Sequence, residues 1–235
     1  SREACYKSTE LAVGLAKRHG TRLHVLHLTT AEEMGFFTPG PMEGKQITAE
    51  VCVHHLFFTD ADYDQRGAAI KCNPAVKSPA DREALLAAVA DGRIDVIATD
   101  HAPHTLEEKE RPYLEAPSGI PYIQHALPCL LEHVHDGRLP LTLVVEKTSH
   151  AVARRFGIVD RGFIREGCWA DLTLVDLRGI HPVRREDLHS RCAWSPFEGR
   201  AFRSAVRATL VSGHVAYRDG TLAPAPQGLR LDFSP

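Results

Sequence analysis

The stretch Ala98-Thr99-Asp100-His101-Ala102-Pro103-His104 decides the fold class of this chain. The segment before it, Ile94-Asp95-Val96-Ile97-Ala98, is mostly apolar and β-branched, so it predicts a short buried strand. Asp100 therefore stands where a strand gives way to a loop, and two histidines follow it closely. A β/α barrel places its catalytic groups at these carboxyl ends of strands. A carboxylate beside imidazoles suits a divalent metal and proton transfer, although an acid and a histidine can also simply cap a loop.

The rest of the first two thirds of the chain alternates between helix and strand patterns. Apolar spacing predicts helices over residues 3–19, 78–90, 124–135 and 141–156, and strands over 22–28, 46–53 and 94–98. Thr30 with Glu33 gives the pattern of a helix start, and Pro79 stands near the first turn of its helix. This alternation is typical of parallel β/α units. A complete barrel needs roughly 200 to 250 residues, so we expect residues 1–158 to form the second half of one.

The character of the sequence changes after about residue 159. Short β-rich runs cover 170–176, 205–211 and 214–217, and the turn Ser212-Gly213 separates the last two as in a hairpin. Residues 159–235 therefore predict a small all-β module. The expected fold class is α/β, with part of a TIM-like (β/α)8 barrel followed by the strands of this module.

Composition and charge exclude several other classes of protein. Hydrophobic residues make up 43% and charged residues 25% of the 235, as in ordinary globular domains. The net charge of −2 offers no basic face for nucleic acid. No apolar run reaches the length of about 18 residues that a membrane helix needs, and the first residues lack a signal-peptide core. Six scattered cysteines without a C-x-x-C pair predict reduced thiols in a cytoplasmic protein.

Polar side chains recur where the predicted strands end. They are His27, His54 and His55, Asn73, and Asp100 with His104. In a barrel the strand ends converge on one face, so we expect these side chains to form one site. Their nitrogen and oxygen donors suit zinc. Because successive strand side chains alternate, one of His54 and His55 should face the barrel interior and the other the outer layer. Asn73 before Pro74 could also simply form a turn.

Taken together, several segments resemble the dihydroorotases of the amidohydrolase superfamily. The matching segments are 26–31, 48–56, Lys71-Cys72-Asn73-Pro74, 99–104 with Glu108-Lys109, and 116–120. Gly167-Cys168-Trp169-Ala170-Asp171-Leu172 resembles a turn in the superfamily's β-sandwich, so residues 159–235 would be its C-terminal strands. The resemblance covers essentially the whole chain in the right order.

The resemblance implies a role for each matching residue. His27 would bind one zinc ion; Asp100 would bind a second and carry the proton as general base and acid. Asn73 and His104 would hold the substrate, His104 at its carboxylate, while the Ser118-Gly119 backbone would line the ring. The implied reaction is the reversible hydrolysis of dihydroorotate to N-carbamoyl-aspartate in pyrimidine biosynthesis, with two zinc ions in a complete site.

Several parts of the family pattern are absent from this chain. They are the His-x-His pair and following Arg of the first strand, the bridging carboxylated Lys or Asp, and a further His ligand. All of them belong to the first half of the barrel, so we expect this chain to be the C-terminal part of a longer protein. Milder departures are Val53, the segment Ala75-Val76-Lys77 and Ser118.

Two alternatives remain open beside the dihydroorotase interpretation. A hydantoinase- or allantoinase-like enzyme would share the scaffold but differ after the strand-end Asp. A non-catalytic dihydroorotase-like subunit would instead serve as a scaffold for a partner such as aspartate transcarbamoylase. The resemblance also implies a small-molecule substrate and a homodimer. The net charge and the lack of a long apolar run speak against nucleic acid and membrane as partners.

Overall fold

The computed structural model describes residues 1–234, and the chain separates into two compact units. The first comprises Ser1–Ala126 with the returning segment Leu188–Glu198, and the second comprises Leu127–Asp187 with the residues from Gly199 onward. The predicted division into domains 1–158 and 159–235 stays a prediction.

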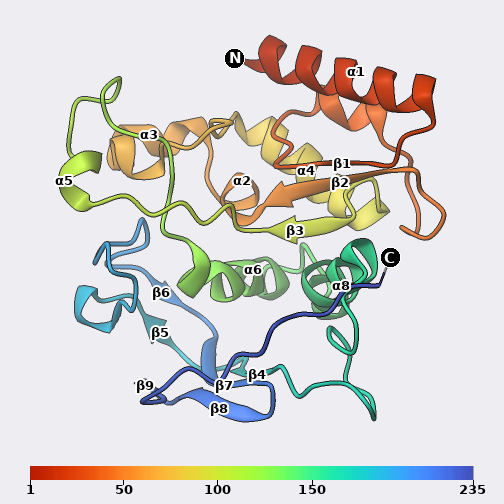
Figure 1. Cartoon of the computed structure of the whole chain (residues 1–235). Coiled ribbons are helices and arrows are strands. Elements are labelled where there is room, and N and C mark those ends of the chain that lie inside the picture. Colours follow the sequence, from red (N-terminus) through yellow and green to blue (C-terminus); the bar gives the residue numbers. More distant parts are fainter. Residues whose placement is uncertain (235) are drawn as a thin grey trace. The chain divides into compact units, whose positions relative to one another are not determined.

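A parallel three-stranded sheet forms the centre of the first unit (Figure 1). Its strands are β1 (Leu23–Val25), β2 (Ile47–Cys52) and β3 (Val96–Ala98), in the order β1-β2-β3. Leu23 pairs with Ile47, and Glu50 pairs with Val96. Since all three strands run in the same direction, their carboxyl ends lie at one edge, as the helix–strand alternation predicted.

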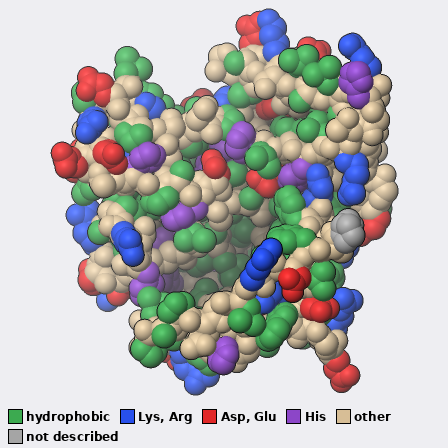
Figure 2. Space-filling model, viewed as in Figure 1, with side chains coloured by type: hydrophobic (Ala, Val, Ile, Leu, Met, Phe, Trp, Pro, Cys, Tyr) green, Lys and Arg blue, Asp and Glu red, His purple; other side chains and the backbone are tan. Residues whose placement is uncertain are grey.

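Helix α1 (Arg2–His19) lies alongside β1 (Figure 1). Ser1 caps its first turn, and Gly20 ends it in the left-handed conformation at φ 65°, which a residue without a side chain adopts most readily. Its inner face buries Thr9, Val13 and Ala16. Figure 2 shows charged side chains of both signs on its exposed face, and histidines at several separate places on this side of the molecule.

Helix α4 (Pro79–Asp91) begins with a reciprocal cap. The Ser78 hydroxyl accepts the Asp81 N–H, while the Asp81 carboxylate accepts the Ser78 N–H, and Pro79 occupies the first turn as predicted. The buried Asp81 carboxylate also accepts the Ala31 N–H at 2.9 Å, so it connects the start of α4 to the segment after β1.

A short helix follows the predicted helix start at Thr30. Thr30 and Glu33 do bond to each other reciprocally, as a capping box requires. The helix that follows is the 3-10 helix η1 (Glu32–Phe36). The local cap is therefore encoded in the sequence, while the length of the helix is not.

Short helices and turns fill the connections after β2 and β3. After β2 come α2 (Val53–Phe57), η2 (Asp60–Asp62), α3 (Tyr63–Arg66) and η3 (Gly67–Ile70), and after β3 come α5 (Leu106–Lys109) and η4 (Ile123–His125). The returning segment adds Phe197, whose ring stacks on Phe58 at 5.4 Å and meets Tyr122 edge-on at 5.3 Å. This aromatic contact explains why a segment so late in the chain belongs to the first unit.

The second unit combines helices with antiparallel strands. Its helices are α6 (Ala126–His135), α7 (Leu141–Val145), the π-helical turn η5 (Glu146–His150) and α8 (Ala151–Phe156); the 3-10 turn η6 (Arg185–Asp187) is also present. The predicted helix over 141–156 is thus continuous, and its middle turn is π-helical instead of α-helical. Strands β4 (Leu172–Asp176), β7 (Ala205–Val211), β8 (His214–Arg218) and β9 (Thr221–Leu222) form one sheet, and β5 (His181–Pro182) pairs with β6 (Ala201–Phe202). The predicted hairpin is β7-β8.

All six cysteines are free, as predicted. Cys52, Cys72 and Cys129 are buried, and the other three are half-buried. Across residues 1–234, no helix combines the length and the apolar character needed to span a membrane.

Candidate functional site

The predicted ligands His27 and Asp100 follow the two outer strands of the parallel sheet. His27 comes after β1 and Asp100 after β3, with β2 between them. Because neighbouring strands lie about 4.8 Å apart, the backbones at these two ends are separated by roughly 10 Å across the sheet. Both residues therefore stand at the same carboxyl edge.

His27 and Asp100 also share an uncommon backbone conformation. Their φ angles are 43° and 46°, in the left-handed region that few residues other than glycine adopt. Such strain persists only where surrounding contacts impose it, and it concentrates at functional sites. Directly after His27, the Leu28 N–H donates to the Glu50 carbonyl at 2.9 Å, so the chain turns sharply while still held against β2.

The predicted substrate-binding residues His104, Ser118 and Gly119 meet in one loop contact. His104 Nε2 donates to the Ser118 carbonyl at 3.1 Å, and its Nδ1 lies 3.6 Å from a Glu108 carboxylate oxygen. A Cβ on Gly119 would lie 2.9 Å from His104 Cδ2 and 2.4 Å from the Ala102 carbonyl oxygen. Only glycine lets these two loops approach so closely. Contact between His104 and a substrate carboxylate would have to replace one of its present partners.

Two lysines hold the loop that carries Ser118 and Gly119. The buried Lys109 amine donates to the carbonyls of Lys71, Pro117 and Gly119, at 3.2, 2.9 and 2.9 Å. Burial lowers the pKa of the Lys109 amine to about 8. The Lys71 amine donates to two further carbonyls of the same loop, those of Tyr113 and Ala116. Neither lysine was predicted to have this role, although the resemblance included Lys71 and Lys109 in its matching segments.

Asn73 lies close in sequence to this loop contact. The Lys71 carbonyl accepts the Gly119 N–H at 2.9 Å, so the segment leading to Asn73 runs beside Gly119. The Asn73 side chain is exposed, as are those of Ser118 and Asp100. The structure thus joins Ser118, Gly119 and His104 directly and brings the backbone that precedes Asn73 next to them.

His101, next to Asp100, has a structural role. Its Nδ1 accepts the N–H groups of Tyr122 and Ile123 at 2.9 and 3.2 Å. The Trp194 indole, from the returning segment, donates to the His104 carbonyl at 2.7 Å. The loop after Asp100 is therefore anchored at both of its histidines.

The expectation for His54 and His55 was wrong. They lie in helix α2 rather than in the strand, and both are buried, at 1% and 3% exposure. Their ring centroids are 4.1 Å apart, so they share one environment instead of facing opposite layers. The strand alternation on which the prediction depended ends at Cys52, one residue before the helix begins.

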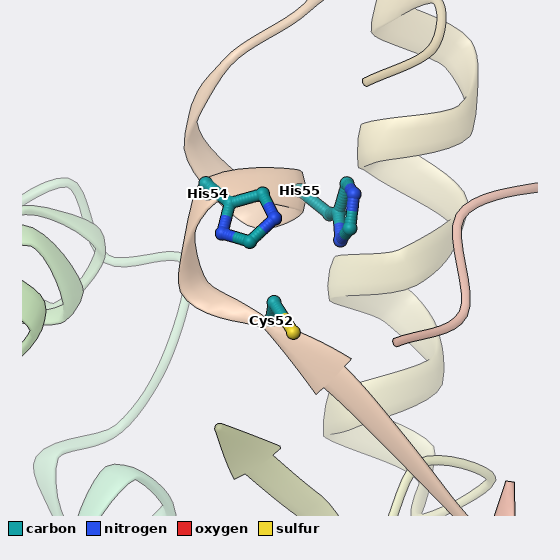
Figure 3. A group of neighbouring side chains, drawn as sticks. All are labelled: Cys52, His54 and His55. Atoms are coloured by element: carbon teal, nitrogen blue, oxygen red, sulfur yellow. The ribbon is translucent and has the colours of Figure 1, made fainter. Parts of the chain in front are cut away.

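Burial changes the protonation of this group. Desolvation lowers the pKa of His54 to about 3 and that of His55 well below its ordinary value, so both rings are neutral near pH 7. Burial also raises the pKa of the neighbouring Cys52 thiol, and the Glu50 and Asp100 carboxylates raise it further. Figure 3 shows the two rings side by side at the turn into α2, with the Cys52 sulfur beside them.

A polar pairing on the sheet was not predicted from the sequence. His24 Nδ1 lies 2.8 Å from the Thr48 hydroxyl, and its Nε2 lies 3.3 Å from a Glu50 carboxylate oxygen. Residues 48 and 50 share one face of β2 because side chains alternate. The presence of polar residues at every second position of β2 was the available signal.

Imidazole and carboxylate are donor types that fit zinc, so His27 and Asp100 suit the implied ion chemically. Within residues 1–234, however, the close group of three potential metal-ligating side chains is Cys52 with His54 and His55. His27 and Asp100 supply two donors at the edge of the sheet, fewer than a zinc site needs.

Comparison with known proteins identifies the family of this chain and several of its relatives. The family described as "Amidohydrolase family" matches residues 2–216. A dihydroorotase from Halobacterium salinarum is 41% identical over 197 residues, covering 84% of this chain and 46% of the relative. An allantoinase from Rubrobacter xylanophilus is 37% identical over 219 residues, covering 92% of this chain and 48% of the relative. The resemblance to dihydroorotases is thereby confirmed.

Solved structures agree with the predicted fold class. The L-hydantoinase (dihydropyrimidinase) from Arthrobacter aurescens superposes with a TM-score of 0.87 at 29% identity. The match covers 93% of this chain and 49% of the hydantoinase. The predicted α/β fold class, of the TIM-barrel type, is therefore confirmed. The chain spans about half the length of the curated relatives it matches.

Proposed function

The chain belongs to the amidohydrolase family, and from this premise we propose that the protein containing it is a metal-dependent dihydroorotase. It would reversibly hydrolyse dihydroorotate to N-carbamoyl-L-aspartate. The observation that carries the proposal is the contact of His104 with Ser118 over Gly119, in the loop that directly follows Asp100. Dihydroorotases at 41% and 38% identity support the same choice of substrate.

The chemistry that we assign to the chain's own residues is proton transfer and positioning. Hydrolysis adds water to the ring carbonyl carbon and breaks the bond to the ring nitrogen. An Asp100 carboxylate oxygen accepts a proton from the attacking water and delivers it to the departing nitrogen. Asn73 and His104 hold the substrate, and the Ser118-Gly119 backbone lies against its ring. The clamp by Lys109 keeps that backbone in place before substrate arrives.

His27 and Asp100 are the residues of this chain that would hold zinc. When bound, two zinc ions in a complete site would supply Lewis acidity, polarising the ring carbonyl and lowering the pKa of water. The further ligands would come from outside this chain.

An allantoinase- or hydantoinase-like activity is the second candidate. The 37% identical allantoinase favours it, as does the structural likeness to an L-hydantoinase. A scaffold without activity is the third. Cytoplasmic location, homodimer formation and association with aspartate transcarbamoylase stay predictions.

Turnover by the full-length protein tests the choice between these functions. We expect hydrolysis of dihydroorotate in preference to hydantoin and allantoin. Activity on the latter two alone would overturn the dihydroorotase proposal, and no activity on any of the three by the metal-loaded protein would favour the scaffold.

Substitution at Asp100 tests the proton-transfer role. Asp100→Asn should abolish turnover while leaving the unfolding temperature nearly unchanged, because the side chain is exposed. Near-normal activity in that variant would refute the role. His104→Ala should raise KM and lower kcat with zinc content unchanged; loss of zinc would instead show that His104 supports the metal.

A further inference from the structure

The turn from β2 into α2 holds a buried group of sulfur and nitrogen donors that the proposed catalysis does not use. Cys52, His54 and His55 each offer one ligand atom, and these atoms all lie within 4.8 Å of one another. All three residues are at least 97% buried. The group is made of side chains from one short segment, so its assembly does not depend on the proposed function.

The tautomer of His55 leaves one ring nitrogen free to bind a cation. Its Nε2 lies 2.9 Å from the Pro74 carbonyl oxygen, which can only accept, so Nε2 must carry the proton. Nδ1 then has an unshared electron pair, and no described residue donates a hydrogen bond to it. A histidine whose other N–H donates to a backbone carbonyl is the usual arrangement of a metal ligand.

His54 is a second buried ring, and its contact with the Thr99 backbone falls outside normal hydrogen-bond geometry. Neither of its nitrogens has a partner of normal geometry among residues 1–234. Buried polar groups in folded proteins are almost always bonded, so His55 Nδ1 and the two ring nitrogens of His54 call for an explanation. In Figure 3 a ring nitrogen of His54 points toward the His55 ring.

We propose that Cys52, His54 and His55 bind a thiophilic divalent cation of the zinc class. One thiolate and two imidazoles are donors that select zinc over magnesium or calcium. Tetrahedral zinc with bonds of about 2.0–2.3 Å places its ligand atoms roughly 3.4–3.6 Å apart. The three side chains therefore need to close by roughly 1 Å, and water or an exogenous ligand completes the fourth position.

The charge around the group also favours a cation. The Glu50 carboxylate belongs to the same face of β2 as Cys52, and its negative charge attracts a metal ion. On binding, the S–H bond of Cys52 breaks, the metal–sulfur bond forms and the proton passes to solvent. Each bound metal thus releases one proton.

Cys72 provides a matched control. It is buried like Cys52, but its Sγ donates to the Pro74 carbonyl at 3.1 Å and lies 3.8 Å from His55 Nε2, the nitrogen that the tautomer excludes as a ligand. Cys72 is thus on the wrong side of the His55 ring to join the site.

Cobalt(II) added to the metal-depleted full-length protein tests the site. Thiolate bound to Co²⁺ gives a near-ultraviolet charge-transfer band, which His27 and Asp100 cannot produce because they contain no sulfur. We expect a band saturating at one thiolate–cobalt centre per chain, unchanged in Cys72→Ser and lost in Cys52→Ser. In His54→Gln, a variant that keeps Cys52, we expect at least tenfold weaker binding of Co²⁺.

Circular dichroism of each variant establishes that it is folded before titration. Absence of the band in the wild type would overturn the proposal. So would its persistence in folded Cys52→Ser, or its loss in Cys72→Ser alone. If Cys52→Ser does not fold, the His54→Gln titration decides, and unchanged affinity there overturns the site.

Discussion

Replacing Gly119 with alanine tests whether close approach of two loops builds the candidate site. Gly119 has φ 143°, a region that costs other residues of order 1–3 kcal/mol. Its new Cβ would also lie 2.4 Å from the Ala102 carbonyl oxygen and 2.9 Å from His104 Cδ2. Relieving such overlaps typically costs a further 1–3 kcal/mol or so. We expect Gly119→Ala to lower the free energy of unfolding by about 4 kcal/mol.

Gly44 offers a matched control for the backbone cost. It also has positive φ, at 80°, but no atom lies within 4 Å of its would-be Cβ. Gly44→Ala should therefore lose only the backbone contribution, about 1–2 kcal/mol. Urea unfolding of the two variants and the wild type gives both values.

The kinetic consequence of Gly119→Ala separates a site effect from simple destabilisation. The displaced His104 ring should raise KM for dihydroorotate in the full-length enzyme, while Gly44→Ala leaves KM unchanged. Equal losses of stability in the two variants, together with equal KM values, would refute the reasoning from contact geometry.

Two further predictions concern buried charges. The Lys109 pKa of about 8 lies below its ordinary value, so between pH 8 and about 10.5 the unfolded chain binds more protons than the folded one. The free energy of unfolding should therefore rise with pH in that range, by about 1.4 kcal/mol per pH unit. Urea unfolding of Lys109→Met should lack this contribution, and parallel pH curves for the variant and the wild type would contradict it. Asp95→Asn should cost about 3–5 kcal/mol because it leaves the Lys45 amine, 2.9 Å away and 8% exposed, without its buried counter-charge. Adding Lys45→Met should recover part of that loss, and a purely additive double variant would contradict the pairing.

The sequence predicted those parts of the site that depend on neighbouring residues in the chain. Asp100 and His27 could be placed at strand ends because each follows a short apolar run, and a strand end needs only local pattern. The start of α4 could be placed in the same way from Pro79. The left-handed backbone conformation of Asp100 and His27 was not predictable, since it results from how the loop after each residue is held.

Other parts of the site depend on contacts between residues far apart in sequence. Trp194 reaches the His104 carbonyl across 90 positions, and Lys109 bonds the carbonyl of Lys71 across 38. No periodicity signals such a bond, because a buried lysine or tryptophan looks like any other core or surface residue until its acceptor is known. His54 and His55 were misplaced for a related reason: a strand running into a five-residue helix cannot be distinguished from a longer strand by alternation alone.

Side chains of β2 alternate between two faces of the sheet, so one strand can pack into the core on one face and present polar or metal-binding side chains on the other. Ala49 and Val51 are fully buried on one face, where an apolar surface stabilises the sheet. Thr48, Glu50 and Cys52 occupy the other face, which in a parallel sheet is normally apolar as well. Polar residues there are tolerated because they have partners: His24 lies within hydrogen-bonding distance of both Thr48 and Glu50. The exception is the carboxyl end, where Cys52 leads into two buried imidazoles with ring nitrogens that lack such partners. The cation that we propose would bind at these nitrogens and so complete the pattern.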